Sequence, residues 1–130
     1  MTRGQIQEYL DFRDKYDVPI YMGESGENTD EWVDQFRTLL DDHGVHWCFW
    51  PYKKMENTRG VMNFNKPDGY DRIVDFAEGD RPTYGAIRAS RPGRDTVLTA
   101  LDQFLENSRY ANCFANEGYV KALGMKENIK

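Results

Sequence analysis

The stretch Val18-Pro19-Ile20-Tyr21-Met22-Gly23-Glu24-Ser25-Gly26 (VPIYMGESG, residues 18–26) joins an apolar run to a turn that contains a carboxylate. A short and nearly continuous apolar run is typical of a strand that is covered on both faces in a parallel sheet. The two glycines allow the backbone to bend sharply on either side of Glu24. A second apolar run, VHWCFW (residues 45–50), follows a segment with helical periodicity. The two runs therefore predict parallel strands joined by a helix.

Hydrophobic periodicity predicts the flanking elements. The connecting helix is expected to begin after Asn28, which with Glu31 forms a capping-box pattern, and to end at Gly44. Residues 53–66 show no periodicity and are expected to form a loop. The other helices are expected over residues 4–16, 68–78, 95–107 and 117–123.

Two strands alone do not make a stable parallel sheet, because both faces must be covered and both edges would carry unpaired backbone groups. The order of elements therefore predicts a piece of a larger α/β fold. Regular alternation places the side chains of Val18, Ile20, Met22 and Glu24 on one face of the first strand, with Tyr21 toward the helices. On the second strand it groups Trp50 with Cys48 and His46, with Trp47 and Phe49 toward the helices.

Composition excludes several classes of function. A chain of 130 residues suits one domain, and the net charge of −5 argues against a nucleic-acid or anionic-membrane surface. No apolar run is long enough for a membrane span. The two cysteines form no C-x-x-C pair and only two histidines are present, so neither a metal nor a cofactor is expected. Cys48 is interpreted as a buried free thiol.

The two strand motifs, VPIYMGESGE (residues 18–27) and GVHWCFWPYKK (residues 44–54), resemble the seventh and eighth strands of glycoside hydrolase family 5, the cellulase-type enzymes. The resemblance covers residues 6–77. It implies a (β/α)8 TIM barrel in which Glu24 is the catalytic nucleophile and Trp50 stacks on the sugar beside the scissile bond. It also implies sugar-hydroxyl contacts from Lys53 and, with less support, from Lys54.

The resemblance further implies that residues 1–80 are the C-terminal part of the barrel and that residues 81–130 are a helical extension packed on it. The substrate would be a β-glucan-type polysaccharide, and the parent enzyme would be extracellular or periplasmic. The family's acid/base glutamate lies in an Asn-Glu-Pro-like motif, which this sequence lacks. The chain is therefore expected to carry the nucleophile of a retaining glycosidase without its acid/base, and to be inactive alone.

Two alternatives remain open. The chain could be a non-catalytic carbohydrate-binding or interaction module that uses Trp50 as a platform, or an inactive fragment that self-associates through its open strand edges. A serine nucleophile elbow is excluded, because Glu27 stands where that motif needs a glycine after Ser25. The acids Glu27, Asp30 and Glu31 are interpreted as helix N-terminal charges.

Overall fold

The computed structural model describes residues 1–56 and 59–125. They form two compact units, one of residues 1–56, 59–63 and 115–125 and the other of Phe64–Phe114. The described residues have a mixed α/β structure with six α-helices and two small open sheets, and no closed barrel is present among them. The expected division into residues 1–80 and 81–130 concerns the parent protein and stays a prediction.

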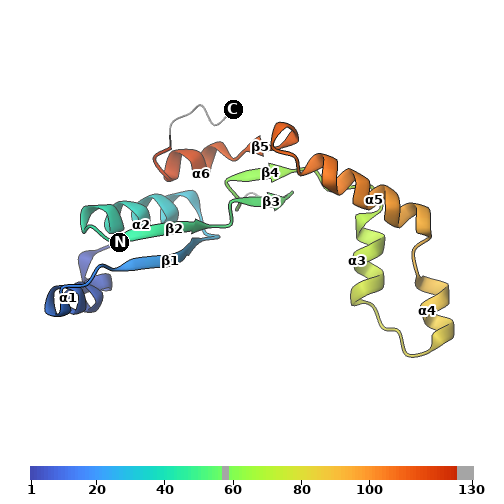
Figure 1. Ribbon diagram of the computed structural model, residues 1–130, viewed down its shortest axis with the longest axis horizontal. Helices are drawn as coiled ribbons and strands as arrows, with labels where there is room; N and C mark the ends of the chain where they lie inside the picture. Colours follow the sequence, from blue (N-terminus) through green and yellow to red (C-terminus); the bar gives the residue numbers. More distant parts are fainter. Residues whose placement is uncertain (57–58, 126–130) are drawn as a thin grey trace. The chain divides into compact units, whose positions relative to one another are not determined.

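The first unit contains the predicted pair of parallel strands, β1 (Tyr21–Gly26) and β2 (His46–Trp50). Helix α2 (Asp30–Asp42) connects them and lies along one face of the sheet (Figure 1). A short 3-10 turn η1 (Arg3–Ile6) and helix α1 (Gln7–Tyr16) precede β1. The parallel arrangement is thus confirmed, although β1 begins and ends later than the apolar run predicted.

The N-terminus of α2 differs from the expected one by a residue. Thr29 is the N-cap, and its hydroxyl accepts a hydrogen bond from the backbone N–H of Trp32 at 3.2 Å. Asn28 instead accepts a hydrogen bond from the N–H of Thr29 at 2.9 Å, so its side chain supports the turn before the helix. The other end is as predicted: Gly44 follows α2 with a φ of 63°, which glycine adopts without strain.

Two apolar clusters hold the first unit together. One lies among α1, α2 and the start of β2, and its buried members are Ile6, Leu10, Leu39, Leu40 and Val45. The other brings helix α6 (Glu117–Ala122) against α2, and its buried members are Val33, Val61, Tyr119, Val120, Ala122 and Leu123. Arg37 of α2 also donates a hydrogen bond to the carbonyl oxygen of Ala122 at 2.8 Å. The last described segment therefore completes the core that surrounds the parallel strands.

The region expected to be a loop at residues 53–66 contains strands β3 (Lys53–Met55) and β4 (Met62–Phe64). With β5 (Phe114–Ala115) they form a sheet of order β3-β4-β5. The loop prediction was wrong because strands of three residues are too short to show a period of two.

The second unit is mainly helical. The predicted helices near residues 68–78 and 95–107 are present as α3 (Tyr70–Glu78) and α5 (Arg94–Asn107). Between them lies an additional helix, α4 (Tyr84–Ser90), and a 3-10 turn η2 (Tyr110–Asn112) follows α5. Within residues 1–56 and 59–125, none of the helices has the length and apolar character needed to cross a bilayer.

Candidate active site at the ends of the parallel strands

A β-bulge in β1 determines where Glu24 points. In the register of the sheet, Met22 is paired with Trp47 and Ser25 with Phe49, so Gly23 and Glu24 together oppose Cys48. A bulge of this kind breaks the alternation of side chains and re-aims the residue that it carries. The thiol of Cys48 donates a hydrogen bond to the carbonyl oxygen of Gly23 at 2.8 Å. The Ser25 hydroxyl donates to the carbonyl oxygen of Cys48 at 3.2 Å, so side chains supply contacts where the ladder is interrupted.

The bulge overturns the predicted faces of β1. Ile20 and Met22 pack against the cluster formed with α1 and α2, so they do not share a face with Glu24 as expected. Tyr21, expected to face the helices, is 63% exposed. A hydrogen bond with Cys48, together with a smaller effect of burial, raises the pKa of the Tyr21 phenol. The prediction of these faces failed because it assumed strict alternation of side chains, whereas the bulge inserts one additional residue between Met22 and Ser25.

The predicted faces of β2 are correct where the structure tests them. Trp47 and Phe49 pack against the buried clusters on the helix side. Trp50 is 56% exposed. Both cysteines are free thiols, but Cys48 is partly exposed rather than buried, because it lies on the less covered face. Cys113 is the buried one.

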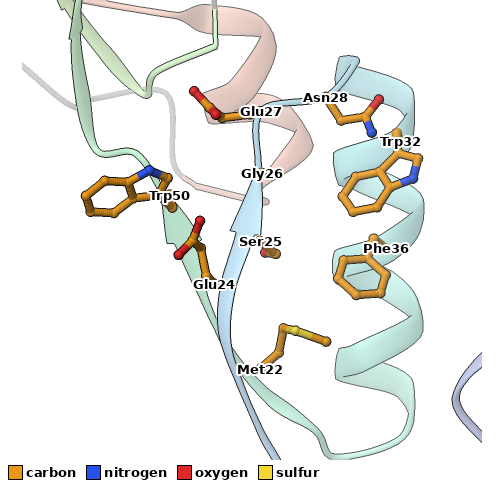
Figure 2. Close-up of a pocket in the computed structure, with 9 residues that line it drawn as sticks. All are labelled: Met22, Glu24, Ser25, Gly26, Glu27, Asn28, Trp32, Phe36 and Trp50. Carbon is orange, nitrogen blue, oxygen red and sulfur yellow. The ribbon is translucent and has the colours of Figure 1, made fainter.

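Glu24 and Trp50 line one open cavity of 440 Å³ at the C-terminal ends of the two strands. Figure 2 shows both side chains on one side of β1, with the rings of Trp32 and Phe36 on the other side. The two rings of α2 lie against each other with centroids 4.8 Å apart. The remaining lining residues are Met22, Ser25, Gly26, Glu27 and Asn28. The structure therefore brings together the carboxylate and the indole that the sequence singled out.

Residues from three other parts of the first unit hold the loop that follows β1. Lys54 of β3 forms an ion pair with Glu27. Arg59 donates a hydrogen bond to the carbonyl oxygen of Glu27 at 2.7 Å. The hydroxyl of Tyr119 donates to the carbonyl oxygen of Asn28. These contacts fix the backbone immediately beyond the bulge, and they engage Lys54 with a protein carboxylate in this structure.

Sequence reasoning gave no role to Tyr119 in this site. It is only 1% exposed and packs edge-on against Phe49 at a centroid distance of 5.0 Å. It lies far along the chain from the residues that it supports, so no local pattern points to it. Trp32 and Phe36 of α2 were likewise given no role in the site by the sequence. Both are partly exposed because they also line the cavity, a role that their spacing of one helical turn cannot reveal.

Replacing Tyr119 by phenylalanine is expected to lower the free energy of unfolding by about 1 kcal/mol, because the carbonyl oxygen of Asn28 loses its partner. Burial raises the pKa of the Tyr119 phenol above its ordinary 10.0. Folding thus favours the neutral phenol, and this contribution to stability is present below pH 10 and lost as the pH rises through the pKa of the folded state. The phenylalanine variant should therefore lose less of its free energy of unfolding than wild type does when the pH is raised into the alkaline range.

Urea unfolding at about pH 8 and about pH 11 measures both effects, since tyrosine ordinarily titrates near pH 10. Tyr9→Phe is the matched control, because Tyr9 is 52% exposed. If wild type and Tyr119→Phe lose the same free energy of unfolding between these two pH values, Tyr119 is not the cause of the pH dependence of stability.

Comparisons with models of protein families, with curated proteins and with solved structures find no match to this chain.

Proposed function

We propose that the chain supplies the seventh and eighth strands of a (β/α)8 glycoside hydrolase of the retaining type, with Glu24 as the nucleophile and Trp50 as the sugar platform. The observation that carries this proposal is the pairing of a carboxylate and an exposed indole at the C-terminal ends of two adjacent parallel strands. In α/β sheets and barrels this is the edge where ligands bind. The substrate class is a β-glucan-type polysaccharide, on the resemblance of the two strand motifs.

The geometry suits attack on a sugar. The bulge turns Glu24 away from the helix side of the sheet. A pyranose ring can approach the carboxylate from the opposite, uncovered side. The indole of Trp50 offers a flat apolar surface beside it. Several contacts hold the loop after β1, so the nucleophile sits on supported backbone.

The acid/base is expected from another part of the parent barrel. Retaining enzymes need two carboxyl groups about 5–5.5 Å apart. Glu27, the nearest other carboxylate along the chain, is already paired with Lys54. The nucleophile can therefore be tested separately only with a substrate that needs no proton donor.

A 2,4-dinitrophenyl 2-deoxy-2-fluoro-β-cellobioside meets this need. A carboxylate oxygen of Glu24 forms a bond to the anomeric carbon, the bond from that carbon to the aryl oxygen breaks, and dinitrophenolate leaves with the electron pair. The fluorine slows hydrolysis of the ester that results. We expect one adduct on the intact chain, which peptide mass spectrometry assigns to Glu24. No adduct, or an adduct on another carboxylate, would refute the proposal.

A second candidate is a carbohydrate-binding module. Its support is a group of exposed aromatic residues in the first unit, Tyr21, Trp50 and Tyr52, which are 63%, 56% and 54% exposed. Stacking on such rings binds sugars without any acid/base. Oligosaccharide binding without labelling of Glu24 would favour this function over the first.

Replacing Trp50 by alanine is expected to weaken binding of cellopentaose about tenfold, because the indole supplies the stacking surface. Isothermal titration calorimetry on the full chain measures this. Tyr84→Ala is the control, since Tyr84 is a ring in the second unit that is still more exposed than Trp50, at 74%. Equal binding by wild type and Trp50→Ala would exclude Trp50 as the platform in both functions.

A further inference from the structure

The segment from Arg81 to Arg94 has an unusual charge for this protein. It contains four arginines and no aspartate or glutamate, although the whole chain carries a net charge of −5. Three of these arginines, Arg88, Arg91 and Arg94, recur every third residue. They lie in the second unit, where α4 ends and α5 begins.

The three arginines line one open cavity of 620 Å³ within this unit. Its volume lies in the range of about 300–1,000 Å³ that is usual for sites of small organic molecules. Apolar side chains line it as well, among them Phe76 of α3 and Val97 and Leu98 of α5. No carboxylate is found among the described residues that line the cavity.

The guanidinium groups of Arg91 and Arg94 form no ion pair within the described part of the chain. That of Arg88 lies over the ring of Tyr84, 5.9 Å from its centroid, which leaves its charge uncompensated. Like charges placed together repel one another, and an anion that bridges them relieves this repulsion. A guanidinium is also suited to two parallel hydrogen bonds with a carboxylate.

The apolar lining defines the rest of the ligand. A bare inorganic anion would leave Phe76, Val97 and Leu98 in contact with water, and a neutral apolar molecule would leave the three cations uncompensated. A molecule that joins both parts satisfies the whole cavity. The first turn of α5, which begins at Arg94, adds backbone N–H groups at the cationic end.

We propose that this cavity binds a small organic anion, a single carboxylate carried on an aryl or alkyl body. The carboxylate lies among Arg88, Arg91 and Arg94, and the body lies on the apolar side chains of α3 and α5. The site is separate from Glu24 and Trp50, so the proposal stands or falls independently of the glycosidase function.

The test uses 4-phenylbutyrate as the probe on the full chain, followed by ¹H–¹⁵N NMR. Two matched compounds accompany it: 4-phenylbutanol has the same body without the charge, and inorganic phosphate has charge without a body. We expect saturable shifts from phenylbutyrate at the amides of Gly93, Arg94 and Val97, and much weaker binding of the other two. The double variant Arg91→Gln/Arg94→Gln should weaken binding of phenylbutyrate by about fivefold or more.

Two further variants define the site. Arg109→Gln is the charge control, because Arg109 lies in the same unit but pairs with Glu106 at 3.1 Å. It should bind phenylbutyrate like wild type. Leu98→Asn, at a residue that is 41% exposed, should weaken binding through the apolar side without unfolding the helix. Equal affinity for phenylbutanol or phosphate, equal weakening by Arg109→Gln, or no saturable shift would each overturn the proposal.

Discussion

Glu24→Gln is expected to lower the rate of covalent labelling by the fluoroglycoside by at least about 10⁴-fold, since removal of a catalytic nucleophile costs on the order of 10⁶-fold in kcat. The neutral amide has no carboxylate oxygen with which to form the glycosyl ester. The replacement has nearly the same shape, and Glu24 is exposed, so the bulge and the packing of the first unit should not change. The mass of the intact chain, followed over time, measures the loss.

The control for this variant is Glu31→Gln. Glu31 is also an exposed carboxylate close in sequence, but it lies in the first turn of α2 and does not line the cavity. Its labelling rate should equal that of wild type. Persistent labelling in Glu24→Gln, or an equal loss in Glu31→Gln, would mean that the reagent reacts with surface carboxylates generally and that Glu24 is not the nucleophile.

Gly26→Ala is expected to destabilise the first unit by about 3 kcal/mol, for two reasons that act together. Gly26 has a φ of 136°, a conformation that residues with a side chain rarely adopt. A β-carbon at this position would also collide with the carbonyl oxygen of Trp50 and lie 2.8 Å from the ring of Phe49. Because Gly26 is paired with Trp50, relief of the collision has to move the two strand ends apart.

Urea unfolding followed by tryptophan fluorescence reports this change, since all three tryptophans lie in the first unit. Gly23→Ala is the matched control three residues earlier in the same strand. A β-carbon there would meet only the Tyr21 ring, at an ordinary contact distance of 3.8 Å. We expect that variant to stay within about 0.5 kcal/mol of wild type. Equal effects at the two positions would show that the approach of Gly26 to Trp50 does not determine stability.

The long elements could be predicted because their apolar residues repeat with a clear period. Helices α2 and α5 present such stripes, and the run at residues 45–50 matches β2 closely. Helix α4 has only seven residues, too few for a reliable period. In the structure Thr83 is its N-cap, and the hydroxyl of Thr83 accepts a hydrogen bond from the N–H of Ala86 at 3.1 Å.

The candidate site was predictable in part. Glu24 follows the first apolar run and Trp50 ends the second, so their arrival at one edge of the sheet follows from the parallel pairing alone. The face of the sheet on which Glu24 lies depends on the bulge opposite Cys48, which results from the pairing of two distant segments. The support from Tyr119 is likewise a tertiary contact across most of the chain, which local spacing cannot encode.

The return of the chain to the first unit at Ala115 has a consequence for its synthesis on the ribosome. A nascent chain that has emerged only as far as residue 114 already has both parallel strands, but it lacks the side chain that packs on Phe49 and holds Asn28. The strand pair must therefore wait, with an unfilled core, until the whole of residues 64–114 has been translated. During that interval the open edges of the strand pair can pair with other chains.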